Sequence, residues 1–378
     1  MASADVVVVG LGAMGSAAAW QLARRGRRVI GFDRFSPPHD LGSSHGRTRI
    51  IREAYFEHPC YVPLLRRAYE SWAELERESG RRLLQTTGGL MAGPDGGALV
   101  EGARRSAVEH GVAHEMLTAG EIRRRFPAFE PPDGIVGLLE PRAGMLFPEA
   151  CIEAAMALAR RHGAELRTDE PVVAWGAEGD AVWVRSASGT LHAGRLVLAA
   201  GAWMPALLGR WGGTLSVDRQ VVFWFEPARR PELFRPDRCP VTVWEDPGGS
   251  VFYTLPDAGD GFKGGVHYEG ETTDPDRVRR ETTADDERAI RVLLERTMPA
   301  AAGRVRDARV CLYTNTPDHH FVVDRHPDHP QVIVASPCSG HGFKFASVVG
   351  EILADLATDG RSRFDLTPFA LSRLGPAL

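Results

Sequence analysis

A β-branched run followed by closely spaced glycines, near the start of the chain, limits the fold more than any other feature. Residues 5–10 read DVVVVG, which is typical of a strand buried on both faces. Gly10, Gly12 and Gly15 come next, and an alanine-rich stretch with helical composition follows them. Because a second apolar run then ends at Asp33, this order predicts a βαβ unit in a parallel sheet.

Each part of this unit has a use in binding a dinucleotide. Gly10 allows a tight turn, Gly12 lets the backbone approach a pyrophosphate, and Gly15 lets the helix pack against the strand. The helix N-terminus attracts phosphate, and Asp33 accepts a hydrogen bond from a ribose hydroxyl. We therefore expect a dinucleotide site whose further contacts include Ala13, Met14 and Arg34. The pattern alone does not separate FAD from NAD.

The length and composition indicate a soluble globular protein with two domains or one elaborated α/β domain. The 378 residues are 43% hydrophobic and 25% charged. A net charge of −4 with scattered basic residues gives no reason to expect nucleic acid. No apolar run reaches the roughly 18 residues that a membrane helix needs. The five cysteines are odd in number and form no CxxC pair, so we expect no disulfides, no zinc and a cytoplasmic location.

Strand patterns divide the rest of the chain. Residues 170–203 alternate strands with turns, and residues 219–307 contain short aromatic strands that are typical of an antiparallel sheet. We expect an α/β protein with two domains. The Rossmann-like domain consists of residues 1–85, 145–215 and 308–378. The discontinuous α+β substrate domain, built on a mostly antiparallel sheet, consists of residues 86–144 and 216–307. We place Val172, Gly201 and Trp203 at the cofactor.

The segment CSGHGFKF, residues 338–345, contains one of only two lysines among the 45 basic residues. An apolar strand pattern precedes it and an amphipathic helix pattern follows, so its glycine-rich turn lies at a helix N-terminus with free amides and a positive dipole. This turn is a second anion-attracting site. A flavin has two such anionic regions, the pyrophosphate and the N1/C2 edge of the reduced ring. We assign to the cofactor Gly340, His341, Gly342, Phe343 and Lys344.

Five segments resemble the monomeric sarcosine oxidase and N-methyltryptophan oxidase family of FAD-dependent amine oxidases. The resemblance covers nearly the whole chain in the same order, and it implies an FAD-binding Rossmann-like domain, a substrate domain and a monomer. The segments are VVVVGLGAMGSAAAWQLARRG, GSSHGRTRIIREAY, GFKGGVHYEG, VCLYTNTPDHHFVVDRHP and SGHGFKFASVVGEIL.

The resemblance implies roles around the flavin ring. Cys311 would carry a covalent thioether to the flavin, with Cys338 as a less favoured attachment point. Lys263 would activate dioxygen, because a compact ammonium stabilises superoxide and an arginine would be a poor replacement. His45 and Arg49 would lie beside the ring. The loop that contains His45 would contact the cofactor through Gly42, Ser43, Ser44 and Thr48.

The resemblance also implies a substrate site, in which Arg52 and Lys344 bind a carboxylate while His267 and Tyr313 line the pocket. We therefore expect an oxidase that passes a hydride from a sarcosine-like secondary amino acid to flavin N5, after which the imine hydrolyses and O2 is reduced to H2O2. Alternatives are a larger N-methyl or cyclic substrate (N-methyltryptophan, pipecolate), an NAD(P)-dependent dehydrogenase, a flavin dehydrogenase that uses another electron acceptor, and a flavin protein without oxidase turnover. The histidines of residues 319–329 lack the spacing of a metal site, and we expect no metal.

Overall fold

The β-branched run at the start of the chain forms a central strand of an eight-stranded sheet. In the computed structural model, which describes residues 4–375, β1 (Ala4–Val9) pairs in parallel with β2 (Val29–Phe32) and with β12 (Gly189–Leu198). The other strands are β9 (Glu165–Arg167), β10 (Ala174–Glu178), β11 (Ala181–Ser186), β19 (Val322–His326) and β20 (His329–Ser336). The predicted Rossmann-like α/β fold is confirmed.

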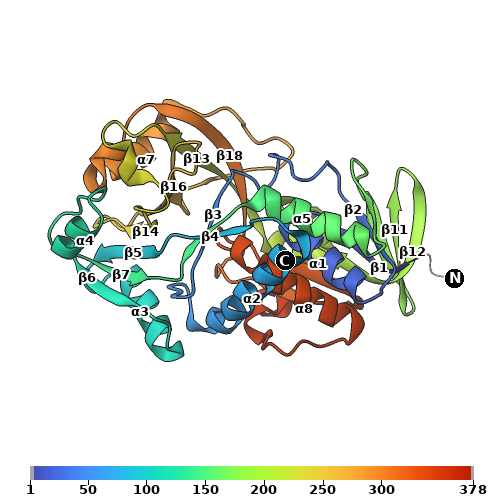
Figure 1. Ribbon diagram of the computed structural model, residues 1–378. Coiled ribbons are helices and arrows are strands. Elements are labelled where there is room, and N and C mark those ends of the chain that lie inside the picture. The colour runs from blue at the N-terminus through green and yellow to red at the C-terminus, as the bar shows by residue number, and fades with distance from the viewer. Residues whose placement is uncertain (1–3, 376–378) are drawn as a thin grey trace.

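Helices from distant parts of the sequence pack together on this sheet (Figure 1). They are α1 (Ala13–Arg24), α2 (Val62–Ser79), α5 (Pro148–Arg161) and α8 (Ala346–Thr358). Proline begins α5, where its missing N–H costs nothing, and α2 ends at Gly80 in the left-handed conformation. The short helix α6 (Met204–Leu207) follows β12.

Short aromatic strands build a second sheet of nine strands, on the left of Figure 1. Its pairings are antiparallel except for that between β5 and β14, so the predicted mostly antiparallel sheet is confirmed. The strands are β5 (Gly89–Pro94), β6 (Glu115–Thr118), β7 (Ile135–Glu140), β13 (Ser216–Phe225), β14 (Val241–Glu245), β15 (Val251–Leu255), β16 (Phe262–His267), β17 (Glu271–Thr272) and β18 (Val305–Asn315). The helices α3 (Ala98–His110), α4 (Ala119–Arg125) and α7 (Ala284–Thr297) accompany it.

A small sheet of three strands, β3 (Arg49–Ile51), β4 (Leu84–Thr86) and β8 (Gly144–Leu146), is separate from both large sheets. Figure 1 shows β3 and β4 between them. The long strand β18 belongs to the second sheet and begins before residue 308, where we expect a domain boundary. The division into two domains stays a prediction.

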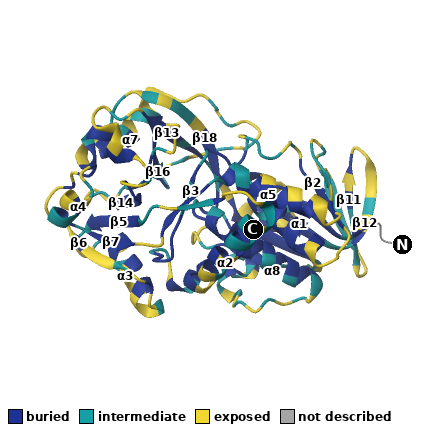
Figure 2. Cartoon of the chain, in the orientation of Figure 1, coloured by how far each residue is buried: buried dark blue, intermediate teal, exposed yellow. Residues whose placement is uncertain are grey.

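Burial follows the composition of the elements. Helix α8, which is rich in small and branched apolar residues, is buried along most of its length, whereas much of α4 and the turn between β11 and β12 is exposed (Figure 2). Within residues 4–375, no helix is both long and apolar enough to cross a membrane.

Candidate active site

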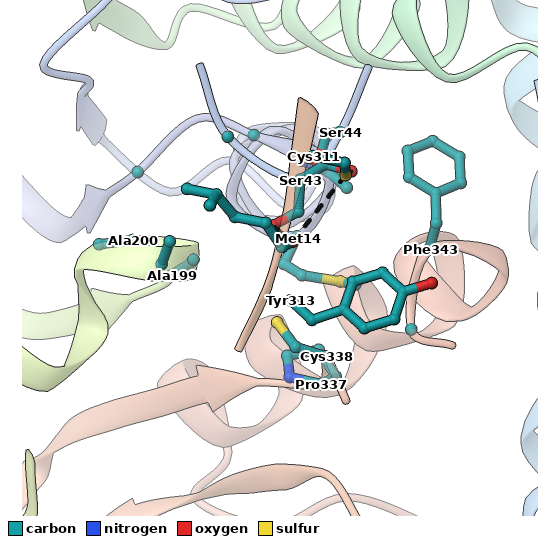
Figure 3. A pocket seen from close by; sticks show the side chains of 18 of the residues that line it. Met14, Ser43, Ser44, Ala199, Ala200, Cys311, Tyr313, Pro337, Cys338 and Phe343 are labelled. Carbon is teal, nitrogen blue, oxygen red and sulfur yellow. Dashed lines mark hydrogen bonds between the residues drawn. The ribbon is translucent and has the colours of Figure 1, made fainter. Parts of the chain in front are cut away.

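A cavity of about 360 Å³ is lined by residues of both large sheets and of the loops that follow their strands. This volume lies within the range of small-molecule and cofactor sites. Figure 3 shows Met14, Tyr313 and Cys338 around the same space, with Ala199 on one side and Phe343 on the other. Segments far apart in the sequence therefore meet at one site.

Most of the residues predicted for the site line this cavity. They are Gly10, Gly12, Ala13, Met14, Asp33, Arg34, Gly42, Ser43, Ser44, Arg49, Arg52, Val172, Gly201, Trp203, His267, Cys311, Tyr313, Gly340, His341, Gly342, Phe343 and Lys344. The other four predicted residues, Gly15, His45, Thr48 and Lys263, are absent from its lining.

The turn after β1 requires glycine at two of its three glycine positions, Gly10 and Gly15. Gly10 has a φ of 91°, and a Cβ there would overlap the carbonyl oxygen of Ala199. A Cβ at Gly15 would overlap the carbonyl oxygen of Gly10, so the close packing of helix on strand requires glycine. A Cβ at Gly12 would meet only the Ser44 hydroxyl, at 3.7 Å, which leaves this side of the turn open.

The other side of this end of the cavity is closed by polar contacts. The buried Asp33 carboxylate accepts hydrogen bonds from the amides of Leu11 (2.7 Å) and Phe35 (2.9 Å), although burial raises the pKa of Asp33. Asp276, in the loop that precedes α7, accepts from Trp203 Nε1 at 2.8 Å and pairs with Arg34 at 3.0 Å. The loop after β17 of the second sheet therefore reaches residues that follow β2 and β12 of the first sheet.

The middle of the cavity holds Cys311, which lies on β18 and is buried. Arg49 Nη2 donates to the Cys311 sulfur at 3.7 Å and to the carbonyl of Ser43 at 2.8 Å. The Ser43 hydroxyl in turn donates to the carbonyl of Leu312 at 2.5 Å. Cys338 also lines the cavity, but burial raises the pKa of its thiol to about 11. The guanidinium contact therefore distinguishes Cys311 from Cys338.

Lys263 lies beside the same loop, outside the cavity lining. Its Nζ donates to the carbonyls of Gly46 and Thr48, each at 2.7 Å, and its side chain is buried. Burial and then the charge of Arg49 lower the pKa of Lys263 well below its usual value. The same two causes lower the pKa of His45 to about 3, and its Nε2 has no hydrogen-bond partner within residues 4–375.

Arg52 is buried and paired with an acid that the sequence interpretation did not include. Its Nη2 donates to both Glu57 oxygens, at 2.9 and 2.8 Å, and its Nη1 donates to the Ala54 carbonyl at 2.9 Å. Its guanidinium carbon also lies 4.3 Å from the centre of the Tyr55 ring. Although burial opposes it, the charge of Arg52 lowers the pKa of Glu57 to about 2. Both side chains line the cavity, so a ligand carboxylate would compete with Glu57 for Arg52.

Lys344 lies near Arg52 in a network of polar side chains. Its Nζ donates to the His341 carbonyl at 2.7 Å and lies 3.4 Å from the Tyr55 hydroxyl, which contacts His341 Nδ1 at 2.6 Å. Burial lowers the pKa of Lys344 to about 7 and that of His341 to about 4. Nearby, His267 contacts the Tyr313 hydroxyl at 3.2 Å, and burial lowers the pKa of His267 to about 3. Near neutral pH these histidines are uncharged and Lys344 is close to half-protonated.

Several other lining residues were missed by the sequence interpretation. Glu57 follows Arg52 by five residues, and an acid so close to a predicted carboxylate-binding arginine was an available signal. Gln220 is a polar residue inside the apolar strand β13, and its buried Nε2 has no partner within the described chain. Val243 and Tyr253, on β14 and β15, carried no signal that distinguishes them from core residues.

These features fit a flavin dinucleotide. The open glycine turn and Asp33 suit its pyrophosphate and ribose, while the unpartnered Gln220 amide, the Arg49 guanidinium and a thiol lie along the rest of the cavity. Within residues 4–375, no group of three or more His, Cys, Asp or Glu side chains lies close enough to hold a metal ion, and all five cysteines are free.

Residues 5–356 match the family described as FAD dependent oxidoreductase, and the chain belongs to this family. It is therefore a flavoprotein oxidoreductase. The match sets aside the nicotinamide-dependent alternative and confirms the family resemblance and the expectation of FAD.

Two curated relatives and one solved structure are similar to the chain over nearly its whole length. The chain is 45% identical to monomeric sarcosine oxidase of Streptomyces avermitilis, over 99% of this chain and 98% of the relative. It is 34% identical to N-methyl-L-tryptophan oxidase of Salmonella arizonae, over 98% of each. NikD, an unusual amino acid oxidase essential for nikkomycin biosynthesis, superposes with a TM-score of 0.85 at 26% identity, over 100% of this chain and 98% of that one.

Proposed function

We propose that the chain oxidises a sarcosine-like secondary amino acid, with dioxygen as the electron acceptor. The observation that carries this proposal is the presence of Arg52 and Lys344 on the lining of the cavity that Cys311 and Arg49 share. Two cations suit a substrate carboxylate. Two relatives are named as oxidases of sarcosine and of N-methyl-L-tryptophan, and these names support a secondary amino acid as the substrate.

The chain's own residues would bind and orient the substrate. Bound FAD would accept an electron pair from the carbon next to the substrate nitrogen and supply it to dioxygen. Arg52 would leave Glu57 and, with Lys344, hold the carboxylate. His267, uncharged and in contact with the Tyr313 hydroxyl, would accept a hydrogen bond from the amine. The fixed amine of Lys263 would place a proton near the site of oxygen reduction.

We also propose a covalent thioether between Cys311 and the flavin. The position of the Cys311 sulfur on the cavity lining supports it, with Arg49 Nη2 fixed 3.7 Å away. The bond would join this sulfur to the 8α-methyl carbon of the flavin. The thiol and the methyl group would each give up one hydrogen, and the two electrons would reduce the flavin and then pass to dioxygen. We propose further that the protein is a cytoplasmic monomer and that it has the two domains predicted from its sequence.

The test is a peroxide assay on the purified holoprotein with sarcosine, N-methyltryptophan, pipecolate and N-methylethylamine. Sarcosine is expected to give the highest kcat/KM. N-methylethylamine, which lacks the carboxylate, is expected to lose about a hundredfold, because two charge-assisted contacts are lost. Equal rates for the amine with and without a carboxylate would overturn the carboxylate assignment. A higher kcat/KM for pipecolate or N-methyltryptophan would replace the sarcosine-like class by the larger one.

A further inference from the structure

Glu140, the last residue of β7, is a buried carboxyl that the proposed function does not use. Its side chain has no exposed surface. The amide of Glu53 donates to its two oxygens at 2.9 and 3.0 Å, and the amide of Ala54 donates at 2.8 Å. Among residues 4–375, no side chain bonds to it. Because a buried acid without a cationic partner is costly, this position calls for an explanation.

The two amides that Glu140 binds belong to the segment that presents Arg52. The Glu53 amide is part of the peptide unit whose carbonyl belongs to Arg52, so holding it restricts the backbone from which the Arg52 side chain departs. The next amide is that of Ala54, whose own carbonyl accepts from Arg52 Nη1 at 2.9 Å. Glu140 therefore fixes both the origin of the arginine side chain and an acceptor of its guanidinium.

The neighbouring acid, Glu53, turns away from this arrangement. Its carboxylate pairs with Arg142, and it lies 3.6 Å from Arg66, both of which are exposed arginines. Glu53 thus ties the segment to the surface, while Glu140 holds its backbone from inside. Burial and, to a smaller extent, the charge of Glu53 raise the pKa of Glu140 to about 7, while the two amide hydrogen bonds and the charge of Arg52 favour its ionised form.

A second acid also accepts hydrogen bonds from two successive backbone amides, which lie a few residues before those that Glu140 binds. Glu149, in the first turn of α5, accepts hydrogen bonds from the amides of Gly46 (2.8 Å) and Arg47 (3.0 Å). These amides lie in the loop whose carbonyls hold Lys263, not in the segment of Arg52. Both amides donate to the same oxygen of Glu149, so a variant that removes the whole carboxylate is needed to break these contacts, and Glu149→Ala is the control for Glu140.

We propose that Glu140 is a positioning residue for Arg52, which holds residues 53–54 so that the guanidinium can meet a ligand carboxylate in the cavity. The inference rests on the proposed role of Arg52 in the function above. Glu140, a fully buried acid on the second sheet, would then contribute to substrate binding without touching the substrate.

The test titrates the holoenzyme with propionate, a carboxylate without an oxidisable amine, and follows the visible absorbance of the flavin. Glu140→Gln retains the shape, but its amide nitrogen cannot accept from a backbone N–H. We expect about a tenfold weaker affinity for propionate. Glu149→Ala, which removes both amide contacts of Glu149, is expected to change it less than about twofold. Flavin content and thermal unfolding, measured on both variants, establish that each is folded. If Glu140→Gln does not fold, Glu140→Asp takes its place, because it keeps the charge but withdraws it from the amides.

A double-variant cycle separates positioning from a general structural effect. In an Arg52→Met background, Glu140→Gln should have no further effect on propionate affinity, because Glu140 acts through Arg52. An equal loss in both backgrounds, or no loss in the Arg52 background, overturns the inference. If Arg52→Met itself leaves propionate affinity unchanged, the Arg52 assignment in the proposed function fails instead, and with it the premise of the inference.

Discussion

The two ends of the cavity differ in how far apart in the sequence their components lie. At the dinucleotide end, Gly10, Gly15 and Asp33 belong to one βαβ unit and act through backbone geometry and one carboxylate. At the reactive end, Cys311 and Lys263 reach the same loop from two strands that flank β13. The first end depends on local chain geometry, and the second depends on the register of distant strands.

The largest expected effect is at the dinucleotide end. In Gly15→Ala the new Cβ overlaps a backbone carbonyl that cannot move aside, so we expect destabilisation of about 1–3 kcal/mol and loss of bound flavin. Thermal unfolding and the ratio of flavin to protein absorbance measure these effects. The control is Gly26→Ala, where nothing lies within 4 Å of the added Cβ and the positive φ alone costs about 1 kcal/mol. Full flavin retention in Gly15→Ala would contradict the close-packing argument.

At the reactive end, Cys311→Ser should release all of the flavin colour into the supernatant after acid precipitation. The hydroxyl cannot form the thioether, although the fold and the dinucleotide turn remain. Cys338→Ser is the matched control and should keep its colour in the precipitate. The reverse pattern would move the attachment to Cys338.

Lys263→Met should slow reoxidation of the reduced enzyme by dioxygen on the order of a hundredfold, because the fixed amine that would place a proton near the site of oxygen reduction is lost. Stopped-flow spectroscopy separates this step from reduction by substrate. Lys263 Nζ lies 5.3 Å from the centre of the Trp224 ring, and the Arg47 guanidinium carbon lies 4.7 Å from it. Arg47 therefore offers a control, since it is half-exposed and pairs with Asp307. Arg47→Gln should change reoxidation less than about twofold. A comparable loss in both variants would mean that general charge, not the position of the lysine, matters.

A smaller effect concerns pH. Lys344 attracts a carboxylate only when protonated, and its pKa is about 7, so propionate affinity should fall by up to about tenfold per pH unit above pH 7. His267 and His341, with pKa values of about 3 and 4, stay uncharged and do not contribute. Glu140 ionises in the same window, but ionisation strengthens its amide contacts. Lys344→Met should therefore leave a flat or rising profile, and a falling one would contradict the assignment.

The sequence predicted the fold of the first sheet and the glycine turn after its first strand, because a βαβ unit with Gly10, Gly12 and Gly15 is a local pattern. The dinucleotide contacts at this turn stay predictions. The family resemblance, which the comparisons confirm, was the basis for the predicted residues at the reactive end. Without it, nothing near residue 263 indicates that its side chain reaches the carbonyls of residues 46 and 48. Glu140 gave no signal, since an acid at the end of an apolar strand is also typical of a turn. The roles of individual site residues stay predictions.

The pairing of Arg52 with Glu57 has a consequence for affinity under the proposed function. The guanidinium is not a vacant cation in the structure without substrate, because the Glu57 carboxylate already holds it. A substrate therefore binds by exchange, and its dissociation constant reports the ratio of two carboxylate affinities rather than the strength of one. Such an internal competitor sets a ceiling on how tightly any carboxylate, including the product amino acid, can be retained.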